Sequence, residues 1–236
     1  MSVHVEAASS FTTTTTERGF TQPSDTYPPA IEHIFVYSGP EAPYPLHMEG
    51  KVISGFGRGS KELGIPTANL PVDEALTPWI ANISSGVYFG YASLALPTTH
   101  PDIPSASSNE PPKAGTEDAL LAAEAPANPP FHIFPMVMSI GYNPFYKNTV
   151  RSAEVHVLHK FTADFYDVPM RLLILGFIRE EKDYKSLEAL IEDINFDCEV
   201  AKNSLAREAW APAKGRVVGG KDLEGKLDVQ WLLRDA

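Results

Sequence analysis

The hydrophobic pattern changes its period once, near residue 187, and this change constrains the fold more than any other feature of the sequence. Before it, apolar residues gather in extended runs rich in aromatic and β-branched side chains. These runs cover Lys51–Ser54, Val87–Leu96, Phe134–Tyr142, Ala153–Phe161 and Met170–Ile178. After it, apolar residues recur every three or four positions from Leu187 to Leu205, which predicts one amphipathic helix. Several strands followed by one late helix predict a small antiparallel barrel or sandwich with the helix packed on it.

Details of these runs predict which residues are buried. Residues 153–158 alternate, so Ala153, Val155 and Val157 share one face, while Glu154, His156 and Leu158 share the other. The run Met170–Ile178 is almost continuously apolar, as expected of a strand buried on both faces. Ser186 is a good N-cap for the helix, and Cys198 lies on its apolar stripe. We therefore expect Cys198 to be a small core residue and not a nucleophile.

Three segments lack the composition of a core. Residues 1–30 are rich in Ser, Thr and Pro and predict a disordered tail. Residues 97–130 contain repeated prolines and predict a long insertion, in which only Glu117–Glu124 is suited to a short helix. Residues 207–236 are glycine-rich and predict an irregular C-terminal extension, with Trp231 as a candidate docking residue.

Charge and cysteine content narrow the class of protein. The net charge of -11 disfavours a nucleic-acid partner, because binding to phosphate backbones needs clustered Lys and Arg. A single cysteine excludes an internal disulfide and agrees with a reducing compartment. We find neither an apolar run of membrane-spanning length nor a secretory signal, so we expect a cytoplasmic protein, with organelle association left open.

A glycine-rich segment at residues 50–70 is the strongest local signal. Alternating glycines allow backbone N–H groups to converge on an anion, and two basic residues add positive charge. The residues concerned are Gly55, Gly57, Arg58, Gly59 and Lys61. The pattern is neither a Walker A loop nor a dinucleotide fingerprint. On the glycines alone, a solvated turn is a better interpretation than a phosphate site.

Other candidate functional residues stand on extended segments. Thr67 and Asn69 are two positions apart, so both can offer oxygen ligands to Mg²⁺ on one side, although such a pair is more often a turn or cap device. Glu154 is a candidate general base with a pKa raised by burial, against the commoner case of an exposed strand carboxylate. His156 and His159 are better explained as residues of the polar face than as metal ligands.

Taken together and in order, these segments resemble the riboflavin kinase family in its eukaryotic, single-function form. The resemblance covers about residues 48–206 apart from the insertion. Its motifs are Gly55-Phe-Gly-Arg-Gly-Ser-Lys, Leu63-Gly-Ile-Pro-Thr-Ala-Asn, Gly86-Val-Tyr-Phe-Gly, Ser139-Ile-Gly-Tyr-Asn-Pro-Phe-Tyr-Lys-Asn, Glu154-Val-His, Asp164-Phe-Tyr, Gly176-Phe-Ile-Arg and Lys182 to Ser186-Leu-Glu-Ala-Leu-Ile.

The resemblance implies a mainly β fold, a six-stranded antiparallel Greek-key barrel with a C-terminal helix, over a kinase domain of residues 31–206. It implies transfer of the γ-phosphate of ATP to the 5′-hydroxyl of riboflavin, which yields FMN and ADP in a Mg²⁺-dependent reaction with Zn²⁺ or Mn²⁺ as alternatives. It also implies a monomer. Residues before 48 are too few for the adenylyltransferase domain of bifunctional relatives, so FAD synthesis is not expected.

The resemblance also implies roles for individual residues. Glu154 would be the base, and Thr67 and Asn69 would lie near the metal. ATP would contact Gly55, Gly57, Arg58, Gly59, Lys61 and Thr67. The flavin would lie near Val157, His159, Arg179, Lys182, Ser186 and Leu187. Of these, Val157 and His159, together with Leu158, would line the neighbouring nucleotide and flavin region. The competing hypotheses are a non-catalytic flavin or nucleotide binder and an acidic interaction protein that works through the insertion.

Overall fold

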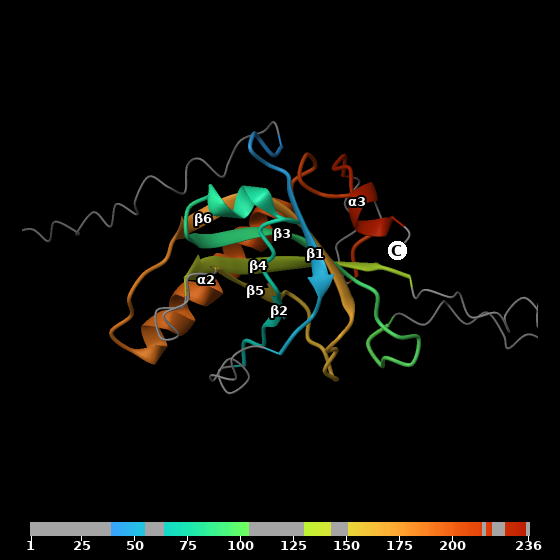
Figure 1. The fold of residues 1–236 in the computed structure, drawn as a ribbon, viewed down its shortest axis with the longest axis horizontal. Helices are drawn as coiled ribbons and strands as arrows, with labels where there is room; N and C mark the ends of the chain where they lie inside the picture. The colour runs from blue at the N-terminus through green and yellow to red at the C-terminus, as the bar shows by residue number, and fades with distance from the viewer. Residues whose placement is uncertain are drawn as a thin grey trace, which may run out of the picture.

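The computed structural model describes residues 39–54, 64–103, 130–142, 151–213, 216–218 and 225–234. One sheet dominates it, with two α-helices and a short 3₁₀-helix around the sheet (Figure 1). The elements are β1 (Leu46–Lys51), β2 (Ala68–Leu70), η2 (Pro78–Ala81), β3 (Gly86–Leu94), β4 (His132–Tyr142), β5 (Arg151–Val157), β6 (Pro169–Glu180), α2 (Leu187–Leu205) and α3 (Gln230–Leu233).

The six strands form an antiparallel sheet in the order β1-β6-β3-β4-β5-β2. Strands β3, β4 and β5 follow one another, and β6 returns to pair with β3, which is the Greek-key arrangement. Beyond the end of β1, the Ile53 amide donates to the Asn69 carbonyl of β2 at 2.9 Å. The two edges of the sheet therefore meet, and the predicted six-stranded Greek-key barrel is confirmed.

Both faces of the central strands are buried, but against different partners. The interior of the barrel is filled by one apolar cluster, to which β3 contributes Tyr88, Ala92 and Leu94. The outer face carries a second cluster, in which Val87, Phe89 and Tyr91 of β3 pack with residues of α2 and the C-terminal segment. This double burial explains the continuous apolar run of β6, and it confirms the prediction for Met170–Ile178.

Strands β3 and β6 approach each other closely at a glycine. Register shifts interrupt their pairing between Val87 and Tyr88 and between Phe89 and Gly90. A Cβ atom on Gly90 would collide with the backbone carbonyl of Leu173. Because the obstacle is backbone, no side-chain movement could relieve it, and the packing of these strands requires glycine at this position.

The helix prediction is confirmed at both ends. Helix α2 spans Leu187–Leu205, and the Ser186 hydroxyl accepts a hydrogen bond from the Ala189 amide at 3.2 Å. Cys198 and Ala201 are buried against the outer face of the sheet, and burial raises the pKa of Cys198 to about 11. A thiol held protonated in this way agrees with a packing role. None of the helices in the described part of the chain is long and apolar enough to cross a membrane.

The sequence misplaced several boundaries. Strand β1 begins at Leu46 and ends at Lys51, where the predicted run begins, and β5 ends at Val157 instead of Phe161. The C-terminal extension contains α3, and Trp231 stacks on His47 of β1 with ring centroids 4.6 Å apart. The predicted tail 1–30 and the segment Glu117–Glu124 lie outside the described residues.

Candidate active site

A row of side chains crosses the outer face of the sheet. The strand registers place Asn69 of β2 opposite Glu154 of β5, Glu154 opposite Ser139 of β4, Ser139 opposite Val87 of β3, and Val87 opposite Arg179 of β6. Directly opposed residues of antiparallel strands point to the same face. Five strands therefore bring a carboxylate, an amide, a hydroxyl and a guanidinium into line beneath α2.

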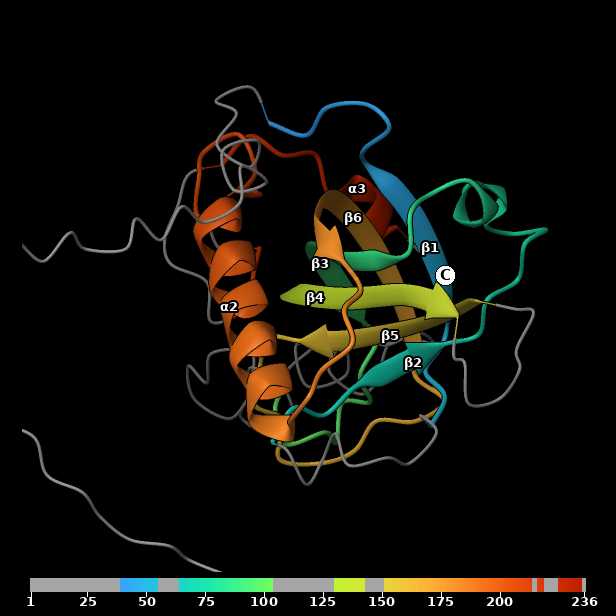
Figure 2. The ribbon, with the colours of Figure 1, turned by 90° about the vertical axis from the view of Figure 1, so that its left-hand side faces the viewer.

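A cavity of about 570 Å³ lies over this row, between the sheet and α2. We call it the outer cavity. Figure 2 shows α2 running alongside the strands, with β2 at the edge of the sheet. Leu190 and Ile194 of α2 form one wall, Glu154 and Ser139 lie on the opposite side, and Tyr184 comes from the β6–α2 connection. Both sides of the cavity therefore carry apolar and polar side chains, with Asp197 on the helix side and Val87, Val137 and Met138 on the sheet side.

Glu154 and Glu181 are two of the four carboxylates that line the outer cavity among the described residues, with Asp183 and Asp197 as the others. Burial raises the pKa of Glu154, and no described residue donates a hydrogen bond to its carboxylate. Burial also raises the pKa of Glu181, and the nearby charge of Glu154 adds to that rise. The Glu181 carboxylate lies directly over Gly141, where a Cβ atom would collide with it. A carboxylate with a raised pKa in a cavity is suited to accept a proton near neutral pH.

Ion pairs connect the β6–α2 segment to the helix. Arg179 donates to both carboxylate oxygens of Asp197, at 2.9 and 2.7 Å, and only 2% of the Asp197 side chain is exposed. Burial raises the pKa of Asp197, and the two hydrogen bonds from Arg179 oppose that rise. Lys182 and the Tyr184 hydroxyl both donate to Asp193, at 2.7 and 3.0 Å. These contacts fix the distance between α2 and the sheet, and with it the width of the outer cavity.

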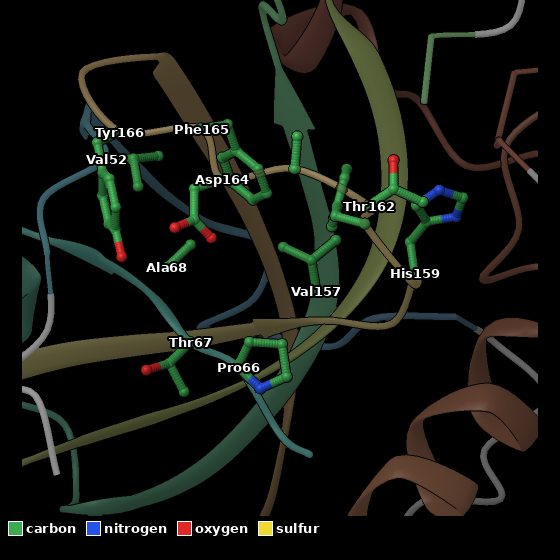
Figure 3. Close-up of a pocket in the computed structure, with 12 residues that line it drawn as sticks. Val52, Pro66, Thr67, Ala68, Val157, His159, Thr162, Asp164, Phe165 and Tyr166 are labelled. Carbon is green, nitrogen blue, oxygen red and sulfur yellow. The ribbon is translucent and has the colours of Figure 1, made fainter. Parts of the chain in front are cut away.

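A second cavity of about 340 Å³ opens on the other side of the sheet (Figure 3). We call it the inner cavity, because Val52, Ala68 and Val157, which belong to the barrel interior, line it. Figure 3 shows the polar tips of Asp164, Tyr166 and Thr67 on one side and His159 and Thr162 on the other. The segment that follows β5 also contributes the aromatic rings of Phe161 and Phe165 to the lining.

Among the described residues, Thr67 is the one that both cavities share in their linings. It immediately precedes β2, which has only three residues and forms an edge of the sheet. The Nδ1–H of His156 donates to the Pro66 carbonyl at 2.8 Å and so fixes the chain beside Thr67. Burial lowers the pKa of His156, which keeps its ring neutral. The two cavities therefore meet around the sheet edge at Thr67.

Asn69 offers an oxygen atom without a partner. Its side chain is only 6% exposed, and its Oδ1 atom is buried without a hydrogen bond. Such an atom costs free energy unless a ligand satisfies it. Among the described residues, no three His, Cys, Asp or Glu side chains gather as a metal site. Thr67 and Asn69 therefore fit a hard cation held mainly by oxygen atoms of the substrate, as Mg²⁺ usually is.

The riboflavin kinase family model matches residues 42–205, which include every strand and α2. The chain belongs to the riboflavin kinase family. It is 62% identical over 200 residues to riboflavin kinase from Pyricularia oryzae, with 84% of this chain and 90% of the relative covered. It is also 62% identical to riboflavin kinase from Chaetomium globosum, with the same coverage. Riboflavin kinase from Trypanosoma brucei has a solved structure with a TM-score of 0.45, at 23% identity, covering 69% of this chain and 78% of that one.

Membership makes the chain a phosphotransferase that uses ATP to convert riboflavin into FMN. The outer cavity brings together Glu154, Arg179 and Lys182 from the predicted site, whereas Val157 and His159 lie in the inner cavity. Ser186 and Leu187 are not among the described residues that line either cavity, and Ser186 caps α2 instead. The predicted phosphate contacts Gly55, Gly57, Arg58, Gly59 and Lys61 lie outside the described residues.

Several site residues were missed at the level of sequence. Glu181 and Tyr184 lie in the β6–α2 connection, which carries no periodic signal. The carboxylates that hold this connection could have been found, because Asp193 and Asp197 are four residues apart and therefore share one face of the predicted helix.

Proposed function

We propose that the two cavities hold the two substrates of the riboflavin kinase reaction, the nucleoside of ATP in the inner cavity and the flavin in the outer one. The position of Glu154 in the outer cavity supports this assignment, because the group that accepts the proton must lie beside the acceptor hydroxyl. The inner cavity is smaller and partly lined by aromatic rings, which suits a purine base. The triphosphate would then pass around the sheet edge at Thr67.

In this proposal Glu154 is the general base. Its carboxylate accepts the proton of the riboflavin 5′-hydroxyl as that oxygen attacks the γ-phosphorus of ATP, and the bond from that phosphorus to the β,γ-bridging oxygen breaks. The raised pKa favours proton transfer near neutral pH, since the driving force is greatest when the base is not strongly acidic. The single observation that carries the proposal is this buried carboxylate facing a cavity large enough for an organic substrate.

Thr67 and Asn69 would hold Mg²⁺ against the phosphates. The ion would supply charge neutralisation at the transferring phosphoryl group. The unpartnered Oδ1 atom of Asn69 supports this role, and because Asn69 is opposite Glu154, the metal and the base would lie on neighbouring strands. The glycine-rich segment from Gly55 to Lys61 would cover the phosphates, as the family resemblance implies.

In this proposal Arg179 and Lys182 shape the cavity and are not direct contacts of the flavin. Both are engaged by carboxylates of α2, so they define the walls of the flavin cavity from the β6 side. The apolar side chains of Leu190 and Ile194 would face the flavin ring. Val157 and His159, once expected near the flavin, are assigned to the nucleotide.

Two cavity variants test the assignment in one assay of FMN formation. Leu190→Trp fills the outer cavity and is expected to raise the KM for riboflavin while leaving that for ATP within about twofold. Tyr166→Ala opens the rim of the inner cavity and is expected to do the reverse, since aromatic contact with a base contributes on the order of 1 kcal/mol. If Leu190→Trp raised the KM for ATP and Tyr166→Ala raised that for riboflavin, the two substrates would have to be exchanged between the cavities. Equal effects on both KM values would reject the assignment.

A further inference from the structure

The beginning of the predicted insertion is folded onto the wall of the inner cavity. The His100 amide donates to the Pro97 carbonyl at 2.8 Å, and the Ile103 amide donates to the His100 carbonyl at 3.2 Å, which makes two successive turns. His100 is only 9% exposed, and Ile103 packs against the barrel core. Residues 97–103, at the start of the predicted insertion, therefore pack on the folded domain.

Asp102 joins this segment to a part of the chain sixty residues away. Its carboxylate accepts hydrogen bonds from the Thr162 amide at 2.7 Å and from the Thr162 hydroxyl at 3.0 Å. The amide of Thr162 lowers the pKa of Asp102, with help from the hydroxyl and from His100. The carboxylate therefore stays ionised and able to accept both bonds at neutral pH. Its side chain is 11% exposed, so water competes little for these bonds.

Thr162 lies midway along the segment that forms the wall. At the two ends of that segment, the His159 amide donates to the Val157 carbonyl at 2.8 Å and the Asp167 amide donates to the Val52 carbonyl at 2.9 Å. The Asp102 carboxylate fixes the middle. Without that contact, Thr162 would lose its hydrogen bonds to residues 97–103.

The rings around Thr162 connect the same two parts of the chain. His100 packs edge-on against Phe161 and Phe165, with centroids 6.1 and 6.3 Å away. Phe161 contacts Phe165 at 4.5 Å and His159 at 4.7 Å. His159, Phe161 and Phe165 all line the inner cavity. A displacement of Thr162 would therefore move the aromatic surface that faces the cavity.

We propose that Asp102 is a positioning residue for the nucleotide: by holding Thr162 it keeps the aromatic wall of the inner cavity in the conformation that receives the base of ATP. Asp102 touches no substrate and acts only through the segment 159–167. The proposal rests on the assignment of ATP to the inner cavity. It also gives residues 97–103 a defined task at the site.

The test compares Asp102→Ala with Asp102→Asn and with Asp73→Ala. Asp73 is a matched control, because its carboxylate also accepts a bond from a backbone amide, that of Ala75 at 2.8 Å, and lines neither cavity. Three quantities are measured for the full chain: KM for each substrate with kcat, hydrogen exchange of residues 158–168 without ligands, and the melting temperature. Hydrogen exchange reports how firmly residues 158–168 are held, whichever substrate the inner cavity binds.

Asp102→Ala is expected to speed exchange in residues 158–168 and to raise the KM for ATP by about three- to tenfold, because only the fraction of molecules with an ordered wall binds tightly. The KM for riboflavin and kcat should stay within about twofold. Asp102→Asn should restore near-normal values, since an amide can still accept from Thr162, and Asp73→Ala should change none of them.

Each of the other outcomes contradicts a particular part of the proposal about Asp102. Unchanged exchange in Asp102→Ala would end the positioning role. Faster exchange with a raised KM for riboflavin and a normal KM for ATP would support the positioning of the wall by Asp102. It would refute the assignment of ATP to the inner cavity instead. A similar loss of kcat and of both affinities, accompanied by a lower melting temperature, would reduce Asp102 to a general stabilising residue. If Asp102→Ala does not fold, Thr162→Val removes the hydroxyl bond alone and should give a smaller change of the same kind.

Discussion

Replacing Glu154 with Gln tests the proposed general base with the smallest change in shape. The substitution keeps the size of the side chain but removes its capacity to accept a proton. General-base catalysis contributes roughly 10²–10⁴ in rate, or about 3–5 kcal/mol of transition-state stabilisation. We therefore expect the rate of phosphoryl transfer to fall by roughly that factor, with the affinities for ATP and riboflavin changed little.

The same variant should be at least as stable as the wild type at neutral pH. The folded-state pKa of Glu154 is raised by burial, so the folded protein binds more protons than the unfolded chain between the two pKa values. Stability is consequently lost as pH rises through the folded pKa, because the folded protein must then bury a charge. Gln carries no such charge.

Single-turnover measurements and thermal melting separate the possible roles of Glu154. In the wild type, the phosphoryl-transfer rate should rise with pH through a pKa above the ordinary carboxylate range, and this dependence should vanish in Glu154→Gln. A folded Gln variant with a near-normal transfer rate would refute the base assignment. A lower melting temperature with a normal rate would show that Glu154 supports the strand.

The remaining predictions concern the metal, the insertion and the fold. Asn69→Ala should raise the Mg²⁺ concentration needed for half-maximal turnover by about tenfold while riboflavin binding stays unchanged, and equal turnover at limiting Mg²⁺ would remove Asn69 from the metal. Replacing residues 104–129 with a short Gly/Ser linker should leave FMN formation within about twofold, and residues 100–103 must be kept because they are folded on the barrel. A collapse of turnover in that folded variant would give the insertion a direct role. Gly90→Ala should lower the free energy of unfolding by about 1–3 kcal/mol in a denaturant titration, because its methyl group would meet the Leu173 carbonyl, and unchanged stability would contradict that close approach.

The sequence predicted the parts of the fold that periodicity determines. Alternation in β5 correctly assigned Val155 to the core and Glu154 to the other face, because a strand side chain has only two directions. The three- and four-residue spacing of α2 gave its start at Ser186, where a hydroxyl was needed to cap free amides. Boundaries failed where tertiary contact decides them. The pairing of β1 with β6 begins at Leu46, in a stretch whose own residues give a weak strand signal.

The residues of the site were easier to predict from the sequence than their arrangement in space. The sequence shows that Thr67 and Asn69 are two residues apart and that Glu154 alternates with apolar residues. The register that places Asn69 opposite Glu154 depends on long-range pairing and could not be predicted. The role of Asp102 was hidden because prolines stand at positions 97, 101 and 104 around it, and repeated prolines predict an insertion. Only the folded chain shows that Thr162 is its partner.

The short strand β2 explains why one strand can serve both substrates. Glu154 and Val157 of β5 are three residues apart, so they lie about 10 Å from each other and on opposite faces of the sheet. A longer β2 would extend the sheet past Thr67 and separate the two cavities, whereas a strand of three residues leaves an edge around which a triphosphate can reach. The proposed acceptor site and nucleotide site then face each other across that edge. On this view Thr67 stands at the passage between them, and a bulky residue there should block phosphoryl transfer while riboflavin still binds.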